Sequence, residues 1–566
     1  MLKVLFYHAN DTLGTSKDPL FVGIAALYLK THLDMTNPEI ANQIEWLLPI
    51  QKRCSDEQLV EYCNRVKPDI LCTSHYIWNH TFITEQLHRV YKKLPQSMLI
   101  VSGGPSIDVN INDKFFNMYP YIDFAMYGAG EQSFADLIES ILKKKKLIAF
   151  NTSNIAWIDK EKNKVIIADF KYVPQHKVSP YLHNKEFFSQ MISDLHQKGI
   201  EVVIPYELTR GCPYSCTFCD WNSGLTNKVS RRKGTYKDEI DLFHHLEIKK
   251  IYLSDANVGQ YDEDVDMISY LANKNINESA GFQIDGNFSK LRKENNLKIY
   301  NLIGEANLST EHAGFTLSVQ DINVNVLQNI DRPDVGWDVH LNIINELHKK
   351  FPNKHCKIQL IQGLPGQTVI SWRETLSEIC KHPVTIQPFI SELLSASPAA
   401  RDKDYQNNFK FEYSNSERSE NKHFFRGAFP KSCTSFSQLD FVKMTMYTII
   451  YTTLQVYKKQ GIEFNLEGVV DEFIGSKNYN VLVDNLYQNW KEHDKFYFTL
   501  DLDLKENIVT ASNFTESVMD WMDSVLLLKL VLNNSLLKDK KEFIRKAVMI
   551  DHNKQFKLNM KKLKAF

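Results

Sequence analysis

Three cysteines lie close together near the middle of the chain. Cys212, Cys216 and Cys219 have the spacing C-x3-C-x2-C and follow an apolar segment, Val202–Ile204, that predicts a strand. A structural zinc site needs four closed ligands, yet the next cysteine is Cys356. Three thiolates on one loop instead suit a 4Fe–4S cube with one iron left open for a substrate or cofactor. The spacing therefore predicts a catalytic metal centre.

The residues around these cysteines resemble a known family. Residues 207–221, ELTRGCPYSCTFCDW, with Phe218 before the third cysteine, resemble the radical S-adenosylmethionine superfamily. The resemblance continues through residues 251–257, 282–285, 315–320, 358–368 and 386–394, which are similar to the second to sixth strands of that superfamily. Between these segments apolar residues recur at helical spacing, as at Trp372, Leu376 and Ile379.

This resemblance implies a partial (β/α)6 barrel over residues 200–400, with the active site at the carboxyl ends of its strands. Cys212, Cys216 and Cys219 would hold the 4Fe–4S cluster on which catalysis depends. The residues that the resemblance implies for S-adenosylmethionine are Phe218, Trp221, Asp255, Asn257, Ser318, Gln320, Arg332, Gln362 and Gly363. Polar residues at strand ends could equally satisfy backbone groups at turns, and both readings stay open for them.

The amino-terminal third must be positioned around that centre. Apolar segments at residues 3–7, 45–48, 69–74, 98–102 and 123–127 alternate with helical patterns, one of which opens on a capping box at Ser55. This alternation predicts an α/β, doubly wound (Rossmann-like) parallel sheet over residues 1–146. Such sheets bind ligands at the carboxyl ends of their strands.

Glycine-rich turns at those strand ends resemble the cobalamin-binding subclass of the same superfamily. The turns are residues 102–105, SGGP, and residues 128–131, GAGE. The implied cobalamin contacts are Ser74, Trp78, Ser102, Gly103, Gly104, Tyr127, Gly128, Gly130 and Glu131. The subclass motif D-x-H-x-x-G is absent, which implies cobalamin without a histidine from that motif. Trp78 is the candidate for packing against the corrin, with ordinary core packing as the alternative.

The subclass implies a methyltransferase that acts on an unactivated carbon and yields S-adenosylhomocysteine and 5′-deoxyadenosine. Two alternatives stay open: a radical rearrangement or cyclisation without methylation, and a methylthiotransferase-like reaction. Methylthiotransferases hold a second cluster on three further cysteines. Cys54, Cys63 and Cys72 occupy that region, but their places in a predicted helix and strand favour small packed residues.

The remaining segments carry no motif. Residues 147–199 are interpreted as a bridge that contains a hairpin-like pair, 155–158 and 165–168. Residues 401–566 are interpreted as a mostly helical, substrate-shaping domain: a loop over 402–440, an apolar helical stripe from 439 to 454, a strand near 496–502 and helices over 515–548. Cys433 could reach the active site or be an inert thiol.

Composition limits the classes of partner. The 566 residues include 67 Lys and Arg against 68 Asp and Glu, a net charge of −1, which argues against broad nucleic-acid or anionic-membrane binding. No apolar run approaches the about 20 residues that span a bilayer, and the first residues lack a signal-peptide pattern. We therefore expect a cytoplasmic enzyme. Its partners would be an external electron donor such as flavodoxin or ferredoxin, and a substrate that could be a peptide, a natural-product precursor, a lipid or a small metabolite.

Overall fold

The chain folds into two compact units in a computed structural model. The first unit comprises residues 1–313, 394–401 and 422–426, and the second comprises residues 314–393, 402–421 and 427–566. The structure describes residues 1–511 apart from 11–18, 77, 108–110, 160–161, 163, 175–176, 222–227, 289–292, 310–314, 333–335, 355, 395–396, 415–427, 460–463, 476–478, 481–482, 485–486, 489, 492–499 and 504–507.

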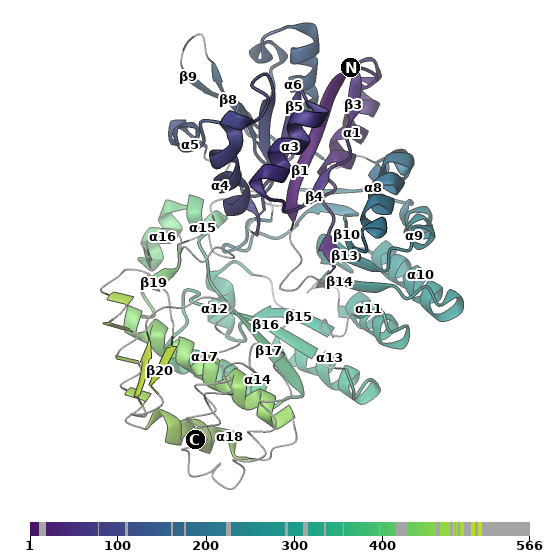
Figure 1. Cartoon of the computed structure of the whole chain (residues 1–566). Helices are drawn as coiled ribbons and strands as arrows, with labels where there is room; N and C mark the ends of the chain where they lie inside the picture. The colour runs from purple at the N-terminus through teal and green to yellow at the C-terminus, as the bar shows by residue number, and fades with distance from the viewer. Residues whose placement is uncertain are drawn as a thin grey trace. The chain divides into compact units, whose positions relative to one another are not determined.

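The first unit begins with a parallel sheet of the predicted doubly wound kind (Figure 1). Its strands follow the order β3-β1-β5-β6-β7, and β4 pairs with the distal half of β1. The bounds are β1 Leu2–Asn10, β3 Ile44–Trp46, β4 Ile50–Lys52, β5 Ile70–Ser74, β6 Leu99–Gly103 and β7 Phe124–Met126. The direction of strand order reverses beside β1, so the switch point at which ligands bind such sheets lies between the carboxyl ends of β1 and β5.

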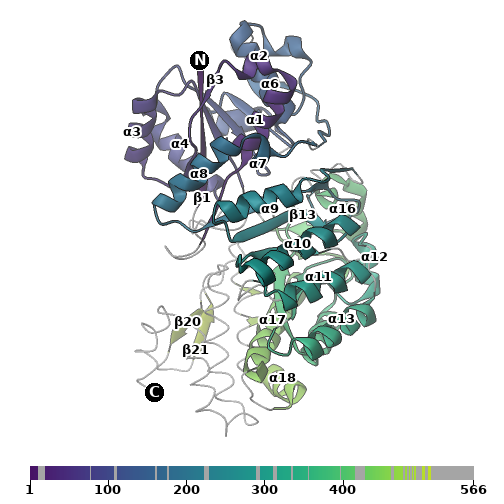
Figure 2. The same cartoon turned by 90° about the vertical axis from the view of Figure 1, so that its right-hand side faces the viewer.

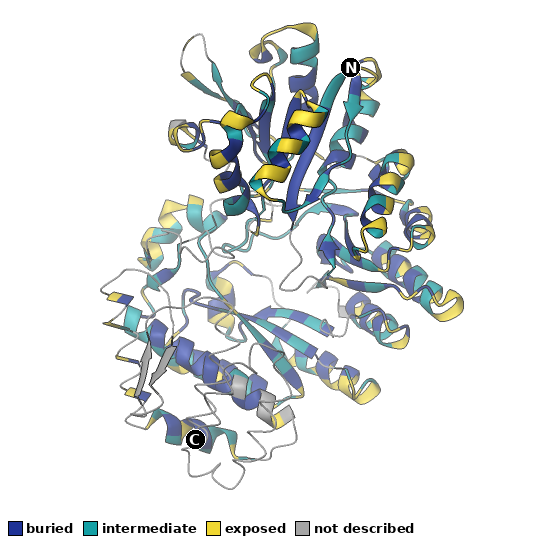
Figure 3. Ribbon diagram, viewed as in Figure 1, coloured by how far each residue is buried: buried dark blue, intermediate teal, exposed yellow. Residues whose placement is uncertain are grey.

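Helices cover both faces of this sheet. One apolar core joins the sheet to α3 (Asp56–Val66), α4 (His80–Val90) and α5 (Asp113–Met118). A second core on the opposite face joins it to α1 (Ala25–Thr36), α2 (Pro38–Ala41) and α6 (Glu131–Lys143). Most of β1 and all of β5 are buried, and Figure 3 shows the outer side of α3 exposed. The capping box predicted at Ser55 opens α3 and is confirmed.

The hairpin-like pair in the predicted bridge is confirmed as β8 (Ile155–Asp159) and β9 (Lys164–Ile167). It does more than bridge, because β8 pairs antiparallel with β7 and extends the amino-terminal sheet. This addition satisfies backbone groups that β7 would otherwise leave open at the edge of the sheet. The sequence shows the hairpin through its alternation but carries no signal for the strand it joins.

The second sheet of the first unit has the order β14-β13-β10-β2 and is parallel throughout. It contains the three segments predicted as the first barrel strands, and β2 from the amino-terminal region joins its edge. Helices α9, α10 and α11 lie side by side along it (Figure 2). The bounds are β2 Leu20–Phe21, β10 Val202–Tyr206, β11 Thr209–Gly211, β12 Val229–Arg231, β13 Lys250–Val258, β14 Gln283–Phe288, α7 Pro180–His183, α8 Lys185–Gln197, α9 Tyr236–His245, α10 Asp262–Glu278, α11 Lys293–Glu305 and α15 Pro398–Arg401.

The second unit has its own parallel sheet, in the order β15-β16-β17. These strands are the fourth to sixth segments of the predicted barrel. The bounds are β15 Phe315–Gln320, β16 Cys356–Gln362, β17 Val384–Ile390, α12 Val324–Asn329, α13 Trp337–Lys350, α14 Val369–Cys380, α16 Lys403–Phe409, α17 Gln438–Lys459, α18 Leu466–Ile474, β18 Glu412–Tyr413, β19 Pro430–Ser432, β20 Leu500–Asp503 and β21 Ile508–Ala511.

The stripe predicted from 439 to 454 is confirmed as α17, which packs against α14 and β17. The loop expected over 402–440 is wrong in part, because α16 and the β18–β19 pair lie within it. Short elements of this kind have too few residues to show a hydrophobic period. The helices expected over 515–548 fall outside the described residues. In the part of the chain that is described, no helix has the length and apolar content needed to cross a membrane.

The turn after β6 gives a stability test on two neighbouring glycines. Gly104 has a φ of +104°, and a Cβ there would lie 2.6 Å from the carbonyl oxygen of His75. A Cβ on Gly103 would meet nothing closer than 3.6 Å. We expect Gly104→Ala to lower the free energy of unfolding by roughly 1–3 kcal/mol because it strains the backbone.

Gly103→Ala is the matched control, with an expected change below about 1 kcal/mol. Urea denaturation of both variants measures the difference. Equal stabilities for the two would show that the tight turn is not required.

Candidate active site

The three motif cysteines lie on the loop that follows β11. The backbone N–H of Cys219 donates to the carbonyl of Cys216 over 3.1 Å, which closes a turn between these ligands. Asn257, near the end of β13, donates from Nδ2 to the sulfur of Cys212 over 3.1 Å. All three cysteines are partly exposed and form no disulfide. The loop thus carries three thiols just after β11, a short strand that pairs antiparallel with β12 and follows the parallel strand β10.

The electrostatics of these thiols fit a cluster. Burial raises the pKa of Cys219 to about 11, and the charges of Asp220, Cys216 and Cys212 add to the rise. Ionising the Cys219 thiol therefore needs a compensating positive charge, which a metal centre supplies. Among the described residues no three metal-ligating side chains converge on a point that would hold a single ion. Each thiolate of an iron–sulfur cube binds a different iron, so its ligands lie farther apart than those of one ion.

Asp255 holds the strand that precedes this loop. Its carboxylate accepts the backbone N–H of Leu208 over 2.8 Å and that of Thr209 over 2.9 Å. Burial raises the pKa of Asp255 to about 7, although these two hydrogen bonds lower it. Both carboxylate oxygens of Asp255 thus accept hydrogen bonds from the backbone at the start of β11. Its predicted contact with S-adenosylmethionine stays a prediction beside this structural role.

The aromatic residues of the loop lie at its end. Trp221 is 41% exposed, and Phe218 is partly exposed. The carbonyl of Thr217 accepts the backbone N–H of Ala399 over 2.8 Å, which ties the loop to α15 in the same unit. The structure thus brings Phe218 and Trp221 beside the cysteines. Their predicted contact with S-adenosylmethionine stays a prediction.

The remaining residues predicted for S-adenosylmethionine belong to the second unit. Ser318 donates to Gln359 over 2.5 Å, and the guanidinium of Arg332 donates to the Ser318 carbonyl. Gln320 ends β15 with a φ of +70°, and its buried Oε1 has no hydrogen-bond partner within the described residues. A strained residue with an unsatisfied buried acceptor at a strand end is typical of a ligand site. Gln320 is therefore the strongest candidate of this group.

Gln362 and Gly363 lie where β16 ends. Gln362 is buried and bonded to α17, donating to Thr445 over 2.7 Å and accepting from Thr448 over 2.9 Å. Gln367 accepts the backbone N–H groups of Gly363 and Leu364 and so shapes the turn after the strand. Gln367 was not among the predicted site residues, although it lies within residues 358–368, the segment that resembles the fifth strand of the superfamily. In the structure, the buried amide of Gln367 and its hydrogen bonds indicate its role in the turn. The hydrophobic periodicity of the sequence does not reveal this role.

The residues predicted for cobalamin gather at the carboxyl ends of β5, β6 and β7. Ser102 is fully buried, and its hydroxyl shares a hydrogen bond of 2.9 Å with Thr73. The chain of hydrogen bonds continues from Thr73 to His75 and from His75 to His80, over 2.8 and 3.1 Å. Both ring nitrogens of His75 are therefore engaged inside the domain. Contacts to a ligand near Ser102 would come from the neighbouring glycine backbone.

Trp78 lies at the switch point of the sheet. Its indole N–H donates to Asn10 Oδ1, at the end of β1, over 3.1 Å. Its ring stacks on Tyr76 at 4.6 Å and 10°, and Arg53 donates to its carbonyl over 2.7 Å. The side chain is nevertheless 36% exposed. A flat aromatic face is thus held in a fixed orientation at the place where sheets of this order bind ligands. Ser74, the last residue of β5, is buried.

The turn after β7 combines backbone freedom with a buried acid. Gly128 has a φ of +66°, and a Cβ there would lie 2.6 Å from the ring of Phe170. Gly130 caps α6, while the Tyr127 hydroxyl donates to the Ala168 carbonyl. Glu131 pairs with Arg210 over 2.6 Å, next to the cysteine loop. Glu131 was predicted for cobalamin, but its carboxylate faces an arginine that the sequence reasoning did not single out.

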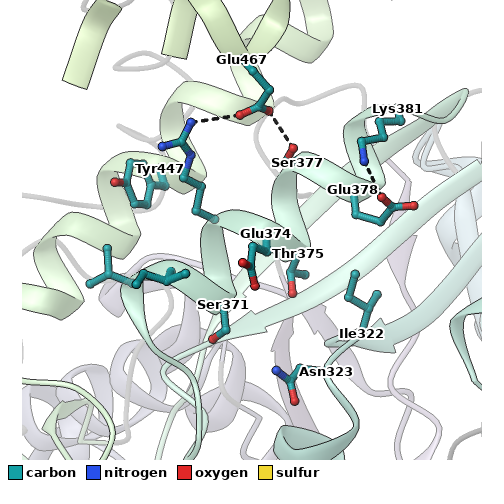
Figure 4. Close-up of a pocket in the computed structure, with 13 residues that line it drawn as sticks. Ile322, Asn323, Ser371, Glu374, Thr375, Ser377, Glu378, Lys381, Tyr447 and Glu467 are labelled. Carbon is teal, nitrogen blue, oxygen red and sulfur yellow. Dashed lines mark hydrogen bonds and ion pairs between the residues drawn. The ribbon is translucent and has the colours of Figure 1, made fainter. Parts of the chain in front are cut away.

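The second unit also holds a cavity of about 650 Å³ along α14 (Figure 4). Its polar side is tied together by Glu467 of α18, which accepts from Ser377 over 2.7 Å and pairs with Arg373 over 3.0 Å. None of the residues predicted for the cluster or for S-adenosylmethionine lines it. The cavity is therefore distinct from the predicted site residues of this unit.

The buried carboxyl of Asp255 predicts a pH effect on stability. Its folded pKa of about 7 lies above the value of about 4 for an unfolded chain. The contribution of Asp255 to the free energy of unfolding is therefore complete below about pH 4. It is lost as the pH rises through 7. Relative to Asp255→Asn, which does not titrate, the wild type should lose about 3 kcal/mol of unfolding free energy between pH 5 and pH 8. Urea denaturation of the metal-free proteins measures this difference, and a constant difference would argue against a buried, protonated Asp255.

Comparisons with known proteins agree with this geometry. Residues 206–379 match the Radical SAM superfamily. The cobalamin-dependent radical SAM methyltransferase TokK of Streptomyces tokunonensis is 28% identical over 319 residues, which are 56% of this chain and 45% of TokK. The 2-(S-pantetheinyl)-carbapenam-3-carboxylate methyltransferase of Streptantibioticus cattleyicolor is 25% identical over 364 residues, 63% of this chain and 51% of that protein. The chain thus spans about half the length of these curated relatives.

A solved structure shows the same fold. The cobalamin-dependent S-adenosylmethionine radical enzyme OxsB, with aqua-cobalamin and S-adenosylmethionine bound, matches 100% of this chain and 80% of its own. The TM-score is 0.56 at 16% identity. This likeness confirms the predicted α/β class, with a doubly wound domain before a partial barrel. On these comparisons, residues 206–379 resemble the Radical SAM superfamily, and the curated relatives named here are methyltransferases, one of them cobalamin-dependent.

Proposed function

We propose that this chain is a cobalamin-dependent radical S-adenosylmethionine methyltransferase that acts on an unactivated carbon. The observation that carries the proposal is the presence, in one unit, of the three-thiol loop after β11 and a strand-end cradle with an exposed, fixed indole at Trp78. Two of the curated relatives are methyltransferases by name, which supports methyl transfer.

The residues of the cysteine loop would hold the cluster that cleaves S-adenosylmethionine. Cys212, Cys216 and Cys219 would hold the cluster, and Asn257 would donate to one of the sulfurs. Hydrogen bonds to cluster sulfurs are one means by which proteins tune its potential. When bound, the cluster delivers the electron that cleaves S-adenosylmethionine, and cobalamin carries the methyl group. An external donor such as flavodoxin or ferredoxin would supply the electron.

Cobalamin would lie against the strand ends of the amino-terminal sheet. Gly104 and Gly128 keep the backbone there free of side chains, and Trp78 offers the flat face. His75 and His80 are bonded to each other, and the chain would contact the corrin through aromatic and backbone atoms. The substrate class stays open among peptides, natural-product precursors, lipids and small metabolites, and residues 401–566 are proposed to shape its pocket.

The cluster ligands are tested by counting iron. Anaerobically reconstituted wild type should hold about four irons per chain. Cys216→Ala should lose the cluster signal and the reductive formation of 5′-deoxyadenosine. Cys63→Ala is the matched control: Cys63 is fully buried in α3, and burial raises the pKa of its thiol to about 12, so it should keep its iron.

About eight irons, with loss of half of them in the Cys63 variant, would favour the methylthiotransferase-like alternative. The reaction itself is read from its products. Methyl transfer yields S-adenosylhomocysteine together with 5′-deoxyadenosine and a methylated substrate. A rearranged product without an added methyl group would contradict the methyltransferase proposal and leave the radical chemistry intact.

The indole of Trp78 is tested by cobalamin binding. Trp78→Leu removes the flat face and should weaken hydroxocobalamin binding roughly 2- to 10-fold, the range expected for one aromatic stacking contact. Trp78→Phe should bind more tightly than Trp78→Leu. Equilibrium dialysis measures both, with Trp337→Leu in α13 of the second unit as the control. An unchanged affinity in Trp78→Leu would place the corrin elsewhere.

A further inference from the structure

Arg210 lies two residues before the first cluster cysteine and faces the amino-terminal domain. Its guanidinium pairs with Glu131 at the start of α6 over 2.6 Å and with Glu207 over 3.1 Å. It also lies over the ring of Tyr28 from α1, at 5.6 Å from the ring centre. The side chains of Arg210 and Glu131 are only 20% and 8% exposed. Residues of α1 and α6 in the doubly wound domain therefore contact Arg210 of β11, the strand that leads into the cysteine loop.

The Glu131 carboxylate is well placed to hold this charge. Burial would raise its pKa, but the charge and hydrogen bond of Arg210 outweigh burial and the net pKa is lowered. Glu131 is also the first residue of α6, where backbone N–H groups favour a negative charge. The pair is thus ionised on both sides, and loss of either partner would leave the other charge without its main counter-ion.

The other face of the same strand is held from the barrel side. Successive side chains of a strand alternate in direction, so Thr209 points away from Arg210. The Thr209 hydroxyl accepts from Arg231 of β12 over 2.5 Å, and its backbone N–H donates to Asp255 over 2.9 Å. Strand β11 is therefore fixed on one face by the barrel and on the other by Arg210.

We propose that Arg210 is a positioning residue that sets the geometry of the Cys212 loop by pairing with Glu131 of the amino-terminal domain. This inference rests on the proposed function only in requiring a cluster on the three cysteines. In this proposal Glu131 binds Arg210 rather than cobalamin. It thereby connects the predicted cobalamin site with the cluster loop. Because Glu131 directly follows the turn 127–130 of the cradle, the cradle and the cluster loop are joined through one ion pair.

A double-mutant cycle on the reconstituted full chain tests the proposal. The variants are Arg210→Gln, Glu131→Gln and the double variant, with Arg210→Lys as the conservative replacement. Arg89→Gln is the control, because Arg89 makes an ion pair of the same kind with Asp56 on an exposed surface of the same domain. The readouts are the rate of iron loss to a chelator and the electron paramagnetic resonance spectrum of the reduced cluster with and without S-adenosylmethionine.

We expect Arg210→Gln and Glu131→Gln each to lose iron about tenfold faster, the lower end of the range for residues that orient metal ligands. Each should also alter the cluster spectrum, and the double variant should be no worse than either single one. Arg210→Lys should recover part of the wild-type behaviour. Glu131→Gln changes a single atom and keeps the shape of the side chain, so it remains informative if Arg210→Gln folds poorly.

Additive effects of the two single variants, or spectra and iron loss equal to those of Arg89→Gln, would overturn the assignment. If the wild type itself holds no cluster, the proposed function fails instead. The two failures are therefore distinguishable in one set of samples.

Discussion

Three partly buried thiols on one short loop are the constraint on which the rest of this structure depends. Burial raises the pKa of Cys219 to about 11, and the charges of Asp220, Cys216 and Cys212 add to the rise. The loop can hold three negative sulfurs only around compensating positive charge, which the irons of a cluster bring. The hydrogen bonds of Asp255 and the ion pair of Arg210 hold β11, the strand that leads into this loop.

The hydrogen bonds around β11 show how two domains share one site within the first unit. Asp255 binds the backbone of β11 from the barrel side, and Arg210 binds Glu131 from the doubly wound side. Trp78 is oriented by Asn10, the last residue of the central strand β1. The proposed cobalamin site lies at the carboxyl ends of parallel strands, and the cluster loop follows the parallel strand β10 and the short strand β11.

The sequence predicts the strands and the loop well because their signals are local. Apolar runs gave β5, β6 and β10, and the family resemblance gave β13 and β15, within one or two residues of their observed ends. The roles of individual polar residues were harder to predict. Asp255 and Glu131, which are predicted as ligand contacts, also bind the backbone of β11 and the side chain of Arg210, and neither contact is visible in the sequence.

These roles could not be predicted because they depend on partners far along the chain. Glu131 lies 79 residues from Arg210, and Asp255 lies 46 from Thr209. No periodic pattern encodes such a pairing, and the order of strands in the sheet decides it. The addition of the β8–β9 hairpin to β7 escaped prediction for the same reason.

The central claim is that one iron of the cluster has no protein ligand and is free to bind S-adenosylmethionine. Electron–nuclear double resonance on the reduced protein, with S-adenosylmethionine labelled with 17O in its carboxylate and 15N in its amine, tests it most directly. Hyperfine couplings from both labels are expected, as the amine and carboxylate would chelate the open iron. A fully reduced cluster that shows neither coupling would contradict the claim, because all four irons would then be closed to the cofactor.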